Sequence, residues 1–177
     1  MQILDAFSAS DLVLLLFVVT AVVSDFRRMK ISNRLIFIGI LIALGFRISQ
    51  DGIREAIYVL WNISFPVILL YLFYLLGAVG AGDVKLFSLI GSFVNFKELV
   101  WTIVFAFGIA ALFSLAKMLQ TGLLFAGLKD GGGYLLGVLR GNRHPYPRCD
   151  LDSHNLIHFS LSMALGLVAA VWYVRFR

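Results

Sequence analysis

Long apolar segments without a charged residue recur along the whole chain. Residues 56–82, 99–116 and 153–174 contain no Asp, Glu, Lys or Arg, and a helix needs about 20 mostly apolar residues to cross a bilayer. Of the 177 residues 60% are hydrophobic and only 14% are charged, whereas about 25% are charged in an average soluble domain. One soluble core is too small to bury these segments, so the sequence predicts an integral membrane protein.

Three further apolar segments are shorter, namely residues 12–24, 35–46 and 86–96. Lys and Arg at the ends of such segments can extend their charged groups to the interface, so a short apolar core can still span a membrane. The sequence therefore predicts an all-α membrane protein with about six transmembrane helices in a single domain, residues 1–177. The expected spans are residues 4–24, 33–50, 56–79, 84–96, 99–118 and 155–174.

The first span is expected to be retained rather than removed as a signal peptide, because Asp5 and Asp11 precede it without any Lys or Arg. The positive-inside rule then places the N-terminus outside and the long polar loop 120–154, just before the last helix, in the cytoplasm. Ten basic residues lie inside in this orientation: Arg27, Arg28, Lys30, Arg34, Lys85, Lys117, Lys129, Arg140, Arg143 and Arg148. Five lie outside: Arg47, Arg54, Lys97, Arg175 and Arg177.

Composition argues against several functional classes. The net charge of +5 follows from basic residues at helix ends, and no basic face with interleaved aromatic residues indicates binding of nucleic acid. Cys149 is the only cysteine, which excludes an internal disulfide and a multi-cysteine zinc site. The three histidines, His144, His154 and His158, are too scattered to indicate a metal site. We therefore expect neither a metal nor a cofactor.

Two aspartates, Asp25 and Asp83, lie at the ends of predicted spans. A carboxylate near membrane depth costs about 2.5–3.5 kcal/mol at a helix centre and is a functional candidate for that reason. Two crossings separate these residues, so both are expected at the same membrane face. Two neighbouring carboxylates cannot both ionise easily, so one holds a proton while the other stays charged. Such a pair can activate a water against a peptide carbonyl without a metal.

The surroundings of each aspartate allow simpler interpretations as well. Gly80 and Gly82 permit unusual backbone torsions beside Asp83 and remove side-chain bulk, but small residues also serve helix packing in membranes. Asp25 is followed by Arg27 and Arg28, either of which can simply neutralise it. Asp130, Asp150 and Asp152 in the polar loop suit either attraction of a basic leader or solvation.

The two aspartate segments together resemble the signature motifs of the type IV prepilin peptidases, which are GxGD-type intramembrane aspartyl proteases. They are residues 25–35, DFRRMKISNRL, and residues 80–86, GAGDVKL. Gly91 is similar to the glycine that follows the second motif. Residues 157–160, IHFS, together with Gly166, are similar to the opening of the last helix in that family.

The resemblance implies an endopeptidase of the cytoplasmic (inner) membrane with Asp25 and Asp83 as the catalytic pair. Its substrate would be a pilin-like precursor (a prepilin), cut at the cytoplasmic face between a short basic leader and the hydrophobic helix. Lys85 and Asn33 fall on motif positions, and the resemblance implies a supporting role for them. Gly80 and Gly82 would line the approach of the substrate.

The sequence also departs from the family pattern. Ser32 stands where the family commonly has a proline between isoleucine and asparagine, and His158 stands where a proline is usual. The N-terminal domain with paired CxxC motifs, which larger relatives carry, has no counterpart before the first span. The chain therefore resembles the minimal enzymes of tight-adherence (Flp) pili, and methyltransferase activity is not expected.

Two other functional classes remain open at this point. A transporter or channel would use the carboxylates as ion or proton sites, but it favours broken helices near mid-membrane and an internal repeat, and the sequence indicates neither. A non-catalytic subunit of a pilus or secretion assembly would tolerate the loss of both aspartates. Substitution of the aspartates separates these classes from a peptidase.

Overall fold

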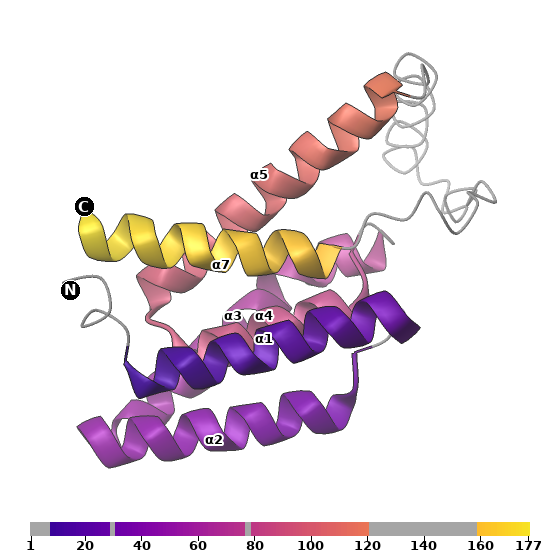
Figure 1. The fold of residues 1–177 in the computed structure, drawn as a ribbon. Helices are drawn as coiled ribbons and strands as arrows, with labels where there is room; N and C mark the ends of the chain where they lie inside the picture. Colours follow the sequence, from indigo (N-terminus) through magenta and orange to yellow (C-terminus); the bar gives the residue numbers. More distant parts are fainter. Residues whose placement is uncertain (1–7, 29–30, 77–78, 121–158) are drawn as a thin grey trace. The chain divides into compact units, whose positions relative to one another are not determined.

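The computed structural model describes residues 8–28, 31–76, 79–120 and 159–177. Within these ranges the chain forms only helices, which Figure 1 shows in sequence order. The helices are α1 (Ala9–Arg28), α2 (Asn33–Asp51), α3 (Glu55–Leu75), α4 (Ala81–Phe93), α5 (Phe96–Gln120) and α7 (Phe159–Phe176). The polar loop 120–154 lies outside the described residues apart from Gln120, and so do Cys149 and the three histidines, His144, His154 and His158.

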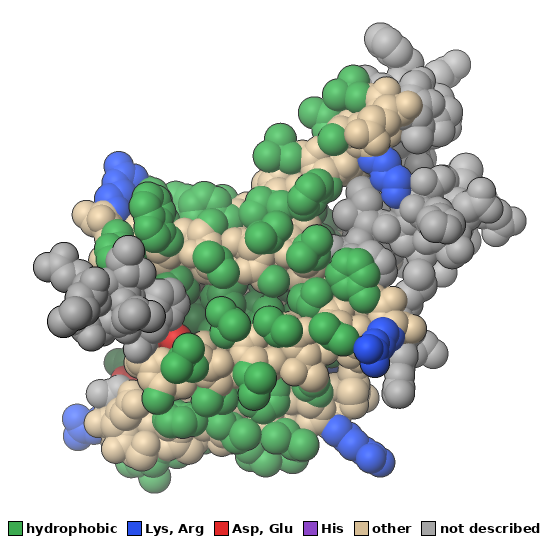
Figure 2. Space-filling model, viewed as in Figure 1, with side chains coloured by type: hydrophobic (Ala, Val, Ile, Leu, Met, Phe, Trp, Pro, Cys, Tyr) green, Lys and Arg blue, Asp and Glu red, His purple; other side chains and the backbone are tan. Residues whose placement is uncertain are grey.

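Five of these helices, all except α4, are long and apolar enough to cross a membrane. Their outward faces carry large hydrophobic side chains: Ile57, Leu60, Ile68 and Leu72 of α3, for example, are all exposed. Figure 2 shows hydrophobic side chains covering α1, α2 and α7 on one face. Exposed apolar area of this extent is typical of a surface that lipid covers. The prediction of an all-α membrane protein is confirmed.

The helix α4 forms the centre of the bundle. All eight residues from Leu86 to Phe93 are buried, and α4 contacts α1, α2, α3 and α7. Its 13 residues extend over only about 20 Å at 1.5 Å per residue, less than the roughly 30 Å of a hydrocarbon core. Because other helices surround it, α4 can be shorter than a lipid-exposed span.

Glycines set the closest approaches between helices in the core. A Cβ atom on Gly91 of α4 would lie 2.6 Å from the backbone oxygen of Asn62 in α3. A Cβ atom on Gly166 of α7 would lie 2.6 Å from the backbone nitrogen of Ala106 in α5. Neither position has room for a larger residue, so these glycines have a packing role of the kind common at helix contacts in membranes.

The chain divides into two compact units, residues 1–107 with 158–177, and residues 108–157. The first unit contains α1 to α4, the start of α5, and α7. Of the second unit the structure describes residues 108–120, which continue α5.

Polar contacts between helices in the first unit gather at two opposite ends. One end, here called the aspartate end, carries Asp25 of α1 and Ser160 of α7, which are hydrogen-bonded. The other, here called the arginine end, carries Asp11 of α1 and Arg175 of α7, which form an ion pair. The two aspartates of α1 are separated by about 21 Å along the helix. Between the ends the core is mainly apolar, and Asn62 and Ser88 donate hydrogen bonds there to the backbone oxygens of Val94 and Ile63.

Candidate active site

The carboxylate of Asp25 lies one turn before the end of α1 and contacts the start of α7. The hydroxyl of Ser160, in the first turn of α7, donates a hydrogen bond of 2.6 Å to Oδ2 of Asp25. Ser160 is 0% exposed, so this contact is sheltered from solvent and lipid. An O–H···O bond of about 2.5–2.7 Å is typical of a hydroxyl that donates to an ionised carboxylate. The last helix therefore completes the surroundings of Asp25.

The carboxylate of Asp83 occupies the first turn of α4. Its Oδ2 accepts a hydrogen bond of 3.2 Å from the backbone N–H of Gly80, the N-cap residue. An acidic residue at the third helical position commonly binds the N-cap amide in this way, and the helix dipole favours negative charge there. The cap holds one oxygen of Asp83 in place at the helix start.

Of the two glycines before Asp83, Gly80 contributes by its small size rather than by a special torsion. Gly80 has φ −77° and ψ 150°, which most residues can adopt, and among the described glycines only Gly52 has a positive φ. The torsional reason given for glycine here is therefore not supported. A Cβ on Gly80 would instead lie 3.1 Å from Oδ2 of Asp83. Gly80 thus leaves space beside the carboxylate, while the Cβ of a side chain at Gly82 would make ordinary contact with Ile31, at 3.7 Å.

Aromatic packing brings the surroundings of the two aspartates together. Phe87 follows Asp83 by one turn, and its ring packs edge-on against Phe159 of α7, with 6.1 Å between the ring centroids. Phe159 directly precedes Ser160, the hydrogen-bond partner of Asp25. The helices α1, α4 and α7 also contact one another in pairs. Asp25 and Asp83 therefore lie at the same end of the bundle, around the start of α7.

The electrostatic environment of Asp83 favours a proton on its carboxyl group. Asp83 precedes the predicted span 84–96 and lies outside the five candidate spans. The pKa of Asp83 is raised from 3.8 to about 6: burial raises it most, the hydrogen bond from the Gly80 amide lowers it, and the negative charge of Asp25 raises it. The influence of Asp25 on this pKa is a second indication that the two carboxylates lie close together. Asp83 is thus suited to hold a proton beside a charged neighbour.

The two supporting residues of the motifs contact each other. Nζ of Lys85 in α4 donates a hydrogen bond of 2.9 Å to Oδ1 of Asn33, the first residue of α2. The residues are 52 positions apart and both are exposed. The contact joins the starts of α2 and α4 at the aspartate end.

Several candidate residues fall outside the described residues. These are His144, His154, His158, Cys149, Asp130, Asp150 and Asp152. Among the residues that the structure describes, no group of three or more His, Cys, Asp or Glu is arranged to hold a metal ion.

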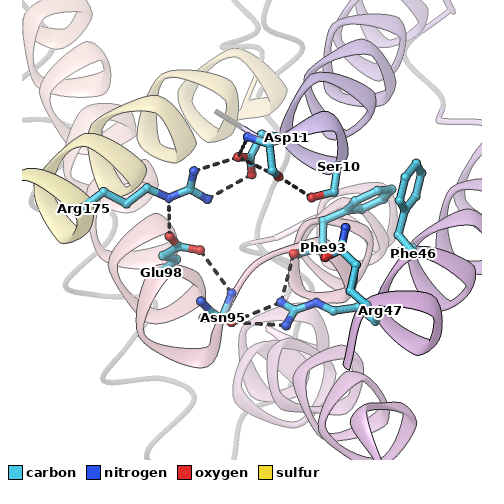
Figure 3. A pocket seen from close by; sticks show the side chains of 11 residues that line it. Ser10, Asp11, Phe46, Arg47, Phe93, Asn95, Glu98 and Arg175 are labelled. Carbon is cyan, nitrogen blue, oxygen red and sulfur yellow. Dashed lines mark hydrogen bonds and ion pairs between the residues drawn. The ribbon is translucent and has the colours of Figure 1, made fainter. Parts of the chain in front are cut away.

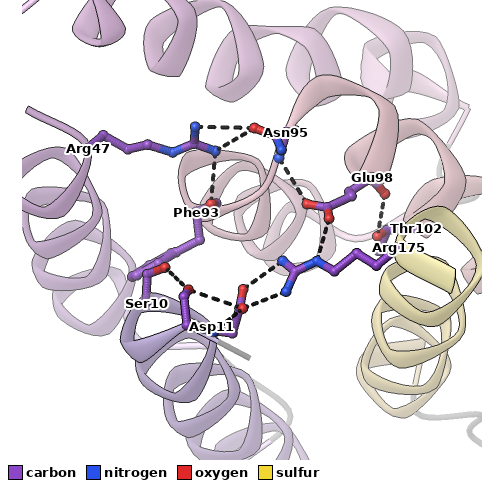
Figure 4. A network of polar contacts seen from close by, with 9 residues as sticks. Ser10, Asp11, Arg47, Phe93, Asn95, Glu98, Thr102 and Arg175 are labelled. Atoms are coloured by element: carbon purple, nitrogen blue, oxygen red, sulfur yellow. Dashed lines mark hydrogen bonds and ion pairs between the residues drawn. The ribbon is translucent and has the colours of Figure 1, made fainter. Parts of the chain in front are cut away.

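The arginine end carries a polar network that sequence analysis did not identify (Figures 3 and 4). The guanidinium of Arg175 donates to Asp11 at 2.7 and 3.0 Å and to Glu98 at 2.9 Å. Glu98 also accepts from the backbone N–H of Asn95, the residue before α5, and Arg47 of α2 donates to the Asn95 side chain. This network lines a cavity of about 220 Å³. It joins α1, α2, α5 and α7.

Sequence analysis also missed the contact of Ser160. A signal was present, because Ser160 belongs to the segment that resembles the opening of a family's last helix. The signal for the arginine end was weaker: Asp11, Glu98 and Arg175 are charges beside apolar segments, where a charge is costly unless it is paired.

The fold and the polar ends together define a helical membrane protein with an acid pair at one end of the bundle. Residues 12–115 match the model of the type IV leader peptidase family. This match covers more than half of the chain, and the chain belongs to this family of membrane proteases. The matched region, residues 12–115, includes both Asp25 and Asp83 and ends before α7. No curated protein and no solved structure matches the chain.

Proposed function

We propose that this leader peptidase is an aspartyl endopeptidase that removes the basic leader of type IV pilin-like precursors at the cytoplasmic membrane face. The observation that carries the proposal is the meeting of Asp25 and Asp83 at one end of the bundle, where burial and the charge of Asp25 both raise the pKa of Asp83. A charged and a protonated carboxyl side by side are what hydrolysis of a peptide by water requires.

The chemistry follows from these two states. Asp25 takes a proton from a water, whose oxygen forms a bond to the peptide carbonyl carbon, while Asp83 donates its proton to the carbonyl oxygen. The tetrahedral intermediate then collapses: the carbon–nitrogen bond breaks, the nitrogen takes the proton held by Asp25, and the oxygen returns its proton to Asp83. Each carboxyl regains its starting state, so no metal or covalent intermediate takes part.

The neighbouring residues have supporting roles in this proposal. The space beside Gly80 and Gly82 admits an extended peptide next to Asp83. The hydrogen bond between Lys85 and Asn33 keeps the starts of α2 and α4 in register, so that Asp83 faces Asp25. In this proposal residues 1–177 act as one domain of the inner membrane, and the excess of basic residues supports a cytoplasmic position for the aspartate end and the loop 120–154. Transfer of a methyl group to the new N-terminus is not expected.

A cleavage assay with purified protein tests this function. The protein in detergent or nanodiscs is incubated with a pilin-like precursor that carries a Lys- and Arg-containing leader, and the new N-terminus of the product is determined by mass spectrometry. We expect one cut, between the leader and the hydrophobic helix, and no cut in a substrate that lacks the leader. Absence of cleavage by folded protein would contradict the proposal.

The activity should depend on pH through Asp83. Because the pKa of Asp83 is raised to about 6, the protonated acid predominates below that pH and the carboxylate above it. The proposed mechanism needs the protonated form, so kcat/KM should fall as the pH rises through about 6 and beyond. Initial rates at low substrate concentration from about pH 5 to about pH 8 report this ionisation in the free enzyme. A kcat/KM that stays level to the top of this range would count against Asp83 as the proton donor.

A further inference from the structure

The hydroxyl of Ser160 differs in its acceptor from six other hydroxyls of the described helices. Those six donate to a carbonyl of the preceding turn in their own helix, and they belong to Thr20, Ser49, Ser64, Ser88, Ser92 and Thr102. This local bond is the usual choice of a helical serine or threonine. Ser88 also reaches a backbone carbonyl of α3, that of Ile63. Ser160 instead donates to a carboxylate on another helix, 135 positions away in the sequence.

The acceptor of this bond, rather than its length, distinguishes it. At 2.6 Å it is no shorter than the neutral bond from Ser92 to the Leu89 carbonyl, but a hydroxyl that donates to a carboxylate favours the charged form of that carboxylate. Ser160 is buried, so neither water nor headgroups compete for its hydroxyl. The bond occupies one lone pair on Oδ2 of Asp25 and limits rotation of the carboxylate. Since α7 lies beyond the family match, which ends at residue 115, this contact adds a residue from outside the matched region.

We propose that Ser160 is a positioning residue that holds Asp25 as the charged, proton-accepting member of the pair. This inference rests on the proposed aspartyl peptidase function. Because the hydroxyl stabilises the charged form of Asp25, the shared proton resides on Asp83. The carboxylate of Asp25 is thereby kept in a fixed orientation towards the attacking water. Ser160 acts through Asp25 and takes no proton itself.

Four proteins test this inference: the wild type and the variants Ser160→Ala, Ser160→Thr and Ser162→Ala. Ser162 is a matched control, since it lies on the same helix, is equally buried, and has a hydroxyl without a hydrogen-bond partner among the described residues. Ser160→Ala should lower kcat by about 10- to 100-fold, as expected when a reacting group is misplaced by up to about 1 Å. Its KM should match that of the wild type, and the protein should remain folded at the assay temperature, although the loss of a buried hydrogen bond lowers its unfolding temperature.

The hydroxyl rather than the size of the side chain should decide the activity. Ser160→Thr keeps the donor and should retain most of the wild-type kcat, and Ser162→Ala should leave kcat unchanged. If Ser160→Ala does not fold, Ser160→Cys replaces it, since it preserves size with a much weaker donor and should show the same loss of kcat. Equal losses in folded Ser160→Ala and Ser162→Ala would overturn the inference, because they would indicate general packing.

The outcomes also separate this inference from the proposed function. Cleavage by the wild type, loss of cleavage in the aspartate variants and a wild-type kcat in Ser160→Ala would overturn the role of Ser160 and leave the aspartyl mechanism in place. Absence of cleavage by the wild type would overturn both. In the Asp25→Asn background, Ser160→Ala should cause no further loss, since the two residues act through one group. An additional tenfold loss in that background would contradict action through Asp25.

Discussion

Asp25→Asn and Asp83→Asn should each lower kcat/KM for leader cleavage by about 10⁴-fold, the upper range for loss of a general acid or base. The amide of asparagine cannot take a proton from water in place of Asp25, and it cannot donate an acid proton in place of Asp83. Because the two carboxyls work as one unit, the double variant should be no less active than either single variant. Product formation over time, measured by mass, gives these rates.

A matched control separates this effect from general damage. Glu55→Gln makes the same change from acid to amide at the start of α3. Glu55 lies 3.4 Å from Arg47 at the arginine end. Partly exposed pairs of this kind contribute little, so Glu55→Gln should cleave at the wild-type rate. Near-normal cleavage by either aspartate variant would contradict the aspartyl mechanism. It would favour a non-catalytic role for the pair, as in an assembly subunit.

Arg175→Gln should lower the free energy of unfolding by about 1–3 kcal/mol, the usual cost of leaving a buried polar group without its partner, because Glu98 is buried although Arg175 itself is exposed. Glu98 is 3% exposed, and Arg175 provides the cationic partner shown in Figure 4. Without the guanidinium, the carboxylate of Glu98 stays buried with its amide contact to Asn95, and Asp11 loses its bidentate partner. Reversible unfolding in mixed micelles measures the change.

Two further variants define the cause of this loss. Arg177→Gln removes an arginine two residues further along, where the side chain contacts Tyr173 at the exposed end of the chain, and should change stability by less than about 0.5 kcal/mol. Adding Glu98→Gln to Arg175→Gln removes the unpaired buried charge and should restore part of the lost stability. A fully stable Arg175→Gln would show that the pair does not hold α1, α5 and α7 together.

The sequence alone was sufficient for the class of fold and for the candidate aspartates. Charge-free segments such as residues 56–82 must be helical in a bilayer, because only internal hydrogen bonds satisfy the backbone there. The predicted span 56–79 corresponds to α3, Glu55–Leu75. The span 84–96 corresponds to α4, Ala81–Phe93, whose burial on all sides has no separate signal in an apolar segment. Both aspartates were identified from local motifs.

Only the tertiary structure decided which polar groups meet. Ser160 and Asp25 are 135 residues apart, and Arg175 and Asp11 are 164 apart. Hydrophobic periodicity and charge distribution predict which face of each helix meets lipid or water. They also predict at which end of the bundle a residue lies. The partner of that residue depends on the rotation and depth of every helix in the bundle. These are set by close contacts such as Gly91 against Asn62, which no single segment of sequence contains.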